Sequence, residues 1–71
     1  MTDESTSELA KRITAAREAK GWAKGKLDRE AKLPSGSVNG YECKGREPSI
    51  RNLRALASAL DIEIADLLAE G

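Results

Sequence analysis

The chain has 71 residues, in which 12 basic side chains balance 12 acidic ones and aromatic residues make up only 3%. This length is enough for one small domain, with a core built from Leu, Ile, Val and Ala. A single cysteine excludes an internal disulfide, and the lack of histidine excludes His-based catalysis and His-ligated metal sites. No apolar run approaches the roughly 20 residues of a membrane span. The polar N-terminus is unlike a signal peptide, so we expect a cytoplasmic protein with no membrane partner.

The hydrophobic pattern predicts an all-α chain of five helices without strands, because no stretch alternates with a period of two. The first helix starts at a capping box, Ser5-x-x-Glu8, and stops at Gly21. The fourth helix is capped by Ser49 and ends at Asp61. The other helices are expected at about 24–31, 35–43 and 62–68.

These helices are expected to form one compact domain over residues 1–71, with residues 1–6 as a flexible N-terminal tail. Apolar residues recur at helical spacing and define the faces that turn inward. The expected core consists of Leu9, Ile13, Ala16, Trp22, Leu27, Ala31, Leu33, Val38, Tyr41, Ile50, Leu53, Leu56, Leu60, Leu67 and Leu68.

Charge is distributed unevenly along the chain. Residues 11–54 contain all 12 basic residues and 5 acidic ones, a net charge of +7, whereas residues 1–10 carry −3 and residues 55–71 carry −4. A basic middle between acidic ends suits a polyanionic partner, and a solvated basic surface is the alternative.

The second and third helices are joined by only three residues, 32–34. Such a short connection forces the helices to cross steeply, as in a helix-turn-helix whose second helix can enter a DNA major groove. An ordinary corner between two helices has the same spacing.

Two longer stretches carry a more specific resemblance. The first runs from Gly21-Trp22-Ala23-Lys24 to Asn39-Gly40-Tyr41-Glu42, and the second includes GREPSI and LRALASALDIEIADLL. Over about residues 8–69 the chain resembles the lambda-repressor-like (Cro/cI or XRE-type) helix-turn-helix family. The resemblance implies five helices, sequence-specific binding to double-stranded DNA, and a phage or bacterial transcriptional regulator, often dimeric on palindromic sites.

The resemblance also implies roles for individual residues. Arg17 and Glu42 match a family pair that forms an ion bridge behind the recognition helix, although two unrelated surface charges remain the alternative. Asn39 has the side chain for a bidentate contact with adenine. The positions expected to contact DNA are Lys24, Ser35, Gly36, Ser37, Asn39, Gly40, Lys44 and Arg46. Of these, Lys24 and Lys44 are phosphate candidates, and Arg46 is either a phosphate contact or merely a surface residue.

Two residues depart from the family pattern in the helix-turn-helix. Asp28 stands where family members usually have Ala, and Lys32 stands where they usually have Gly. Because a buried carboxylate is costly, we expect Asp28 at the helix edge or bonded to Lys24 or Lys32. Gly36 and Gly40 lack side chains at two reading positions, and each weakens the third helix by about 0.5–1 kcal/mol.

The leading interpretation is a transcriptional repressor that reads the major groove with the third helix, in the nucleoid of a prokaryotic or phage-infected cell. The alternative is a helix-turn-helix module that binds another protein, such as an antitoxin or anti-repressor. No enzyme activity and no cofactor are expected, because the sequence has no nucleophile–base set, metal cluster or phosphate-loop motif. A weak homodimer, formed in solution or only on DNA, is expected through residues 44–48, Ile62, Ile64, Leu67 and Leu68.

Overall fold

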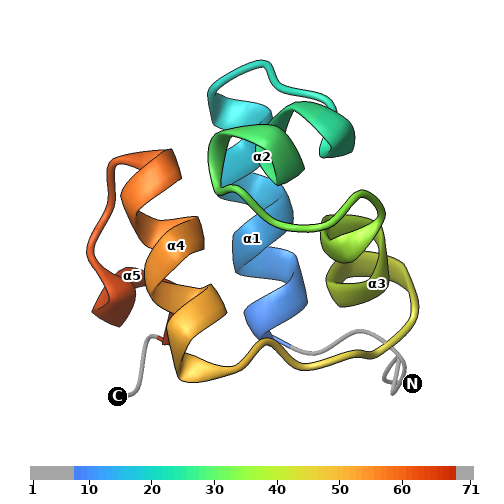
Figure 1. Cartoon of the computed structure of the whole chain (residues 1–71). Coiled ribbons are helices and arrows are strands. Elements are labelled where there is room, and N and C mark those ends of the chain that lie inside the picture. The colour runs from blue at the N-terminus through green and yellow to red at the C-terminus, as the bar shows by residue number, and fades with distance from the viewer. Residues whose placement is uncertain (1–7, 69–71) are drawn as a thin grey trace.

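Five helices and no strand make up residues 8–68, the part of the chain that the computed structural model describes. The expected capping residue Ser5 and the tail over residues 1–6 lie outside this range. The all-α, five-helix prediction is confirmed, and Figure 1 shows the helices gathered around one centre. In chain order they are α1 (Glu8–Ala19), α2 (Lys24–Glu30), α3 (Ser37–Cys43), α4 (Ile50–Leu60) and α5 (Ile64–Leu68).

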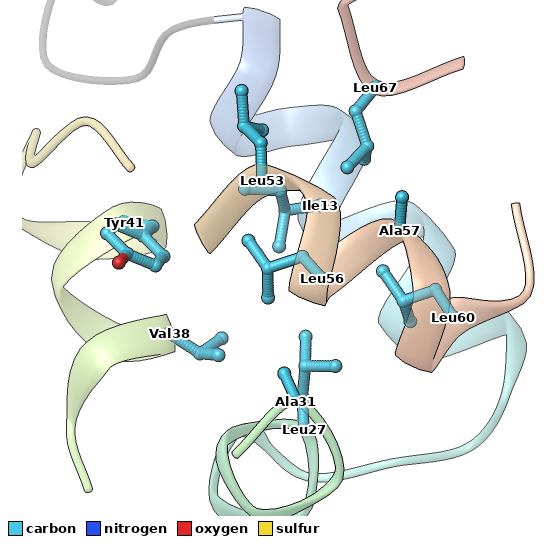
Figure 2. Packing of buried hydrophobic residues seen from close by; sticks show 10 residues of the cluster. All are labelled: Ile13, Leu27, Ala31, Val38, Tyr41, Leu53, Leu56, Ala57, Leu60 and Leu67. Carbon is cyan, nitrogen blue, oxygen red and sulfur yellow. The ribbon is translucent and has the colours of Figure 1, made fainter. Parts of the chain in front are cut away.

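Every helix contributes at least one fully buried side chain to a single core. Ile13, Leu27, Val38, Leu56 and Leu67, one from each helix in order, are at most 1% exposed. Figure 2 shows Leu56 pointing from α4 into the space between the other helices. Helices this short are only marginally stable alone. The burial of apolar side chains in the shared core therefore stabilises each of them.

The edges of the core differ from the sequence prediction. Ile50 and Leu68 were expected inside but are 58% and 40% exposed. Ile50 is the first residue of α4, and the first buried residue of this helix is Leu53, one turn later. The side chain of Ile50 therefore lies outside the core. Leu68 directly follows the buried Leu67, and one residue of a helix turns the side chain by about 100°.

In α1 the buried face consists of Ala10, Ile13 and Arg17, at a spacing of three and four residues. The sequence prediction had placed Leu9 and Ala16 on that face, and both are only partly buried. The buried face of α1 therefore differs from the predicted one, because the side chain of Arg17 points inward. Trp22 and Leu33 are likewise packed against the core without being fully buried.

Helix ends follow local signals where such signals exist. Ser49 caps α4, since its Oγ accepts a hydrogen bond from the backbone N–H of Asn52. Gly21 follows α1 in the left-handed conformation, with φ +73°. Its N–H donates to the carbonyl of Glu18, while Trp22 N–H donates to that of Arg17. This pair of bonds is the Schellman ending that the glycine predicts.

The start of α3 is two residues later than predicted. Ser35 and Gly36 were expected inside the helix, but α3 begins at Ser37. Gly36 precedes it with φ +90°, a left-handed conformation that side chains strongly disfavour. Gly36 is therefore required by the turn, and it does not weaken a helix interior as the sequence prediction assumed. No helix within residues 8–68 is long and apolar enough to cross a membrane.

Candidate nucleic-acid interface

The turn between α2 and α3 closes directly on the end of α2. The N–H of Lys32 donates to the carbonyl of Arg29, and that of Leu33 donates to the carbonyl of Asp28 at 2.8 Å. Lys32 itself takes the left-handed conformation, with φ 60°. For a residue with a Cβ this conformation costs about 1–2 kcal/mol. The tight turn is thus retained without the usual glycine, at a cost in backbone strain.

The carboxylate of Asp28 ties α2 to the beginning of α3. Asp28 is only 4% exposed, and its two oxygens accept hydrogen bonds from the backbone N–H groups of Gly36 (2.9 Å) and Val38 (2.8 Å). The expectation that Asp28 would bond to Lys24 or Lys32 is wrong. Two backbone donors compensate the buried charge instead, and they satisfy N–H groups at a helix start that has no capping side chain of its own.

At the other end of α3, Glu42 is held by a fork of hydrogen bonds from Arg17. The Nε and Nη2 atoms of Arg17 donate to the two carboxylate oxygens of Glu42 at 2.8 and 3.1 Å. The Nη1 atom donates to the backbone carbonyl of Trp22 at 2.6 Å. Hydrogen bonding to Glu42 raises the pKa of Arg17 above its usual value. These contacts fasten α3 to α1 and to the loop that follows α1.

The carboxylates of Asp28 and Glu42 both lie on the inner side of the helix-turn-helix. Together they fix α3 at its two ends. The Arg17 and Glu42 side chains are 10% and 4% exposed, so solvent screens this ion pair very little. A helix of only seven residues has little stability by itself. Its position is therefore set by these polar contacts and by Val38 and Tyr41 in the core (Figure 2).

The structure gathers the residues expected to contact DNA along α3 and its two flanking segments, with different accessibilities. Ser35, Gly36, Lys44 and Arg46 are exposed, and Lys24, Ser37 and Asn39 are half-buried, whereas Gly40 is buried. The hydroxyl of Ser37 donates to the carbonyl of Pro34 at 2.7 Å. The hydroxyl of Ser37 therefore donates its hydrogen within the turn, although its oxygen can still accept a hydrogen bond from a ligand.

Lys24 bridges α2 and α3. Its Nζ donates to Oδ1 of Asn39 at 3.2 Å and lies 3.5 Å from Sγ of the exposed Cys43. The sequence predicts two separate contacts, Lys24 with a phosphate and Asn39 with a base. Their separation of fifteen residues gave no signal that they meet. Within residues 8–68, no group of three Cys, Asp or Glu side chains is arranged to hold a metal ion.

Gly40 is covered by a side chain from the following loop. A Cβ built on Gly40 would lie 2.9 Å from Cδ of Arg46, closer than atoms in contact ever approach. The backbone N–H of Arg46 also donates to the carbonyl of Gly40 at 3.1 Å. The expectation that Gly40 presents a bare outward surface to DNA is therefore wrong, because the Arg46 stem occupies that surface.

Two lysines approach the ring of Trp22 in the loop after α1. The Nζ atoms of Lys20 and Lys26 are 5.0 and 5.5 Å from the centre of its ring. Both lysines also pair with carboxylates, Lys20 with Asp61 at 3.8 Å and Lys26 with Glu30 at 3.0 Å. Much of the basic charge near α2 is thus already engaged in contacts within the domain.

Comparison with known proteins places this geometry in a family. A family model described as helix-turn-helix matches residues 13–67. The structure is similar to the restriction-modification controller protein C.AhdI from Aeromonas hydrophila, with a TM-score of 0.80 and 35% identity over 84% of this chain and 91% of that chain. It is also similar to the hypothetical transcription factor NHTF from Neisseria, with a TM-score of 0.82 and 29% identity over 93% of this chain and 75% of that chain. No curated protein sequence matches. The chain belongs to the XRE-type helix-turn-helix family of DNA-binding transcription regulators.

Proposed function

We propose that the protein is a sequence-specific repressor that inserts α3 into the major groove. The observation that carries this proposal is the fastening of α3 at both ends, by Asp28 at its start and by the Arg17–Glu42 pair at its end. A recognition helix must hold a fixed angle to the rest of the domain, because a small misplacement removes its base contacts. The buried polar contacts provide this fixed angle.

The accessible residues divide into two groups by the contacts that they can make. Ser35, Ser37 and Asn39 carry hydroxyl and amide groups suited to base edges, and Gly36 allows the backbone to come close to the groove. Lys24 and Lys44 flank α3 and carry charges suited to phosphates. Phosphate contacts position the domain on any duplex, whereas base contacts distinguish one sequence from another.

A regulatory role is supported by the two similar structures. One is described as a controller of restriction-modification and the other as a transcription factor. We extend a control function of this kind to the present chain, acting on the DNA of a prokaryotic or phage-infected cell.

We also propose that two copies bind one palindromic site. One helix-turn-helix reads a half-site, and two half-sites on the same face of the duplex lie about 34 Å apart. Ile64 is half-buried and Leu68 is exposed on α5, so these residues are available to a second copy. Leu67, which the sequence prediction included in this surface, is 1% exposed and belongs to the core.

Selection of bound sequences from a random duplex pool, followed by titration at two salt concentrations, tests this function. We expect an enriched palindrome that is bound at least about 10³-fold more tightly than random duplex, with two protomers per site at saturation. Binding to both duplexes should weaken with salt, because phosphate contacts release counterions. Equal affinity for all sequences would contradict sequence-specific regulation and favour a protein partner for the domain.

A further inference from the structure

The side of α3 that faces away from the core carries no long side chain. Val38 and Glu42 are turned inward, and two residues along a helix correspond to a rotation of about 200°. Gly40 and Cys43, three residues apart in α3, therefore share the outer side. A recognition helix normally carries its reading side chains on this side, but here Gly40, in the middle of α3, has none.

Arg46 fills this gap from the loop. Its Cγ, Cδ and Nε atoms are the three closest neighbours of the position that a Gly40 Cβ would occupy, at 2.9–3.6 Å. The contact is supported by the backbone, because Gly45 turns the chain with φ +72° and Arg46 N–H then returns to the Gly40 carbonyl. The stem of Arg46 therefore lies across the outer side of α3.

The guanidinium at the end of this stem is available for a ligand. Within residues 8–68, Arg46 makes no hydrogen bond or ion pair through its side chain, and it is exposed. Arg17, by contrast, is fully engaged with Glu42 and Trp22. The domain thus holds an unpaired planar cation on the outer side of its recognition helix.

We propose that Arg46 reads a base in place of the side chain that α3 lacks, and that Gly40 is the positioning residue that seats it. The inference rests on the proposed function, since it names a specificity determinant of the same interface. The chemical target is the edge of guanine in the major groove, whose O6 and N7 acceptors match two guanidinium N–H donors. A phosphate is the other acceptor within DNA, and it would give no preference for sequence.

The test measures the ratio of affinities for the selected duplex and a scrambled duplex of the same length. Arg46→Ala should lower this ratio about 5- to 150-fold, which corresponds to one bidentate base contact. Arg46→Lys should restore little of it, because an ammonium lacks the planar fork. The duplex selected by Arg46→Ala should lose one guanine preference in each half-site. Lys44→Ala serves as the matched control for charge and should weaken both duplexes equally.

The role of Gly40 is tested in two backgrounds. Gly40→Ala should lower the affinity ratio when Arg46 is present and should have no effect when residue 46 is Ala. Gly25→Ala is the matched control, because Gly25 is also helical and an added Cβ there would meet nothing within 4 Å. Thermal unfolding of each variant checks that the fold is retained.

Three results would overturn the inference without touching the proposed function. In the first, the wild type selects a sequence but Arg46→Ala keeps the same affinity ratio. In the second, Arg46→Ala binds every duplex more tightly, which would show that the arginine covers the interface. In the third, Gly40→Ala lowers the ratio equally in both backgrounds, so that it acts independently of Arg46. If the wild type selects no sequence at all, the proposed function fails first.

Discussion

The carboxylate of Asp28 in α2 accepts a hydrogen bond of 2.8 Å from the backbone N–H of Val38, the second residue of α3. A side chain of the first helix of the helix-turn-helix thus caps the second helix. Gly36, at the usual capping position, has no side chain for this purpose, and its own N–H donates to the other oxygen of Asp28. The start of α3 consequently depends on a residue eight to ten positions earlier in the chain.

Asp28→Ala should destabilise the domain by about 1–3 kcal/mol for each N–H that loses its partner without gaining water. Asp28→Asn should cost less, because one amide oxygen still accepts one of the two bonds. Urea unfolding monitored by circular dichroism measures both. Glu30→Ala in the same helix removes only an exposed ion pair with Lys26 and should cost under about 1 kcal/mol. A loss at residue 28 no larger than that at residue 30 would show that the cap is dispensable.

Arg17→Ala should be among the most destabilising changes, by about 3–5 kcal/mol, because it leaves the nearly buried carboxylate of Glu42 unpaired. The double variant Arg17→Ala with Glu42→Ala should lose less stability than the sum of the two single changes, since no unpaired charge remains. Lys26→Ala removes a more exposed ion pair, with Glu30, and should cost under about 1 kcal/mol. Additive losses in the double variant would argue against a coupled pair.

Lys32→Gly should stabilise the protein by about 0.5–1 kcal/mol, because glycine adopts the observed φ of 60° without strain. The gain is smaller than the full strain, since glycine also increases the entropy of the unfolded chain. Lys44→Gly is the matched control. Lys44 has φ −114°, so the same substitution relieves no strain and should lower the midpoint of thermal unfolding. If both changes shift the midpoint downward, Lys32 is not strained.

Leu56→Ala should cost about 2–5 kcal/mol, because it opens a cavity at a fully buried side chain of the core (Figure 2). Ile50→Ala in the same helix should change the free energy of unfolding by less than about 1 kcal/mol, since Ile50 is mostly exposed. Denaturant unfolding of the two variants compares a core position with a position wrongly assigned to the core from periodicity alone.

The sequence predicts those parts of the fold that local signals determine. Gly21 and Ser49 fix a helix end and a helix start through bonds to residues within five positions, and both were predicted from sequence. The start of α3 was not, because Asp28 supplies its cap from another helix. The sequence did contain one signal for this cap. Gly36 has no side chain that could cap the helix, and Asp28 departs from the family pattern a few residues earlier.

The candidate interface shows the same division. The pattern that resembles the family predicts DNA contacts in and around the third helix, which the structure places at Ser37–Cys43. It could not show that Lys24 contacts Asn39 or that Arg46 covers Gly40, because long flexible side chains carry no periodic signal for their tertiary partners. These contacts change the expected behaviour of variants at four of the eight predicted DNA-contacting positions.

The reading of sequence by α3 is tested most directly by the affinity of Asn39→Ala for the selected duplex and for random duplex. We expect a loss of about 1–3 kcal/mol on the selected duplex and a much smaller loss on random DNA. Lys24→Ala should weaken both duplexes and also lower the preference at the base read by Asn39, because Lys24 holds the Asn39 amide at 3.2 Å. Equal losses on both duplexes for Asn39→Ala, or no loss on either, would contradict a reading role for α3.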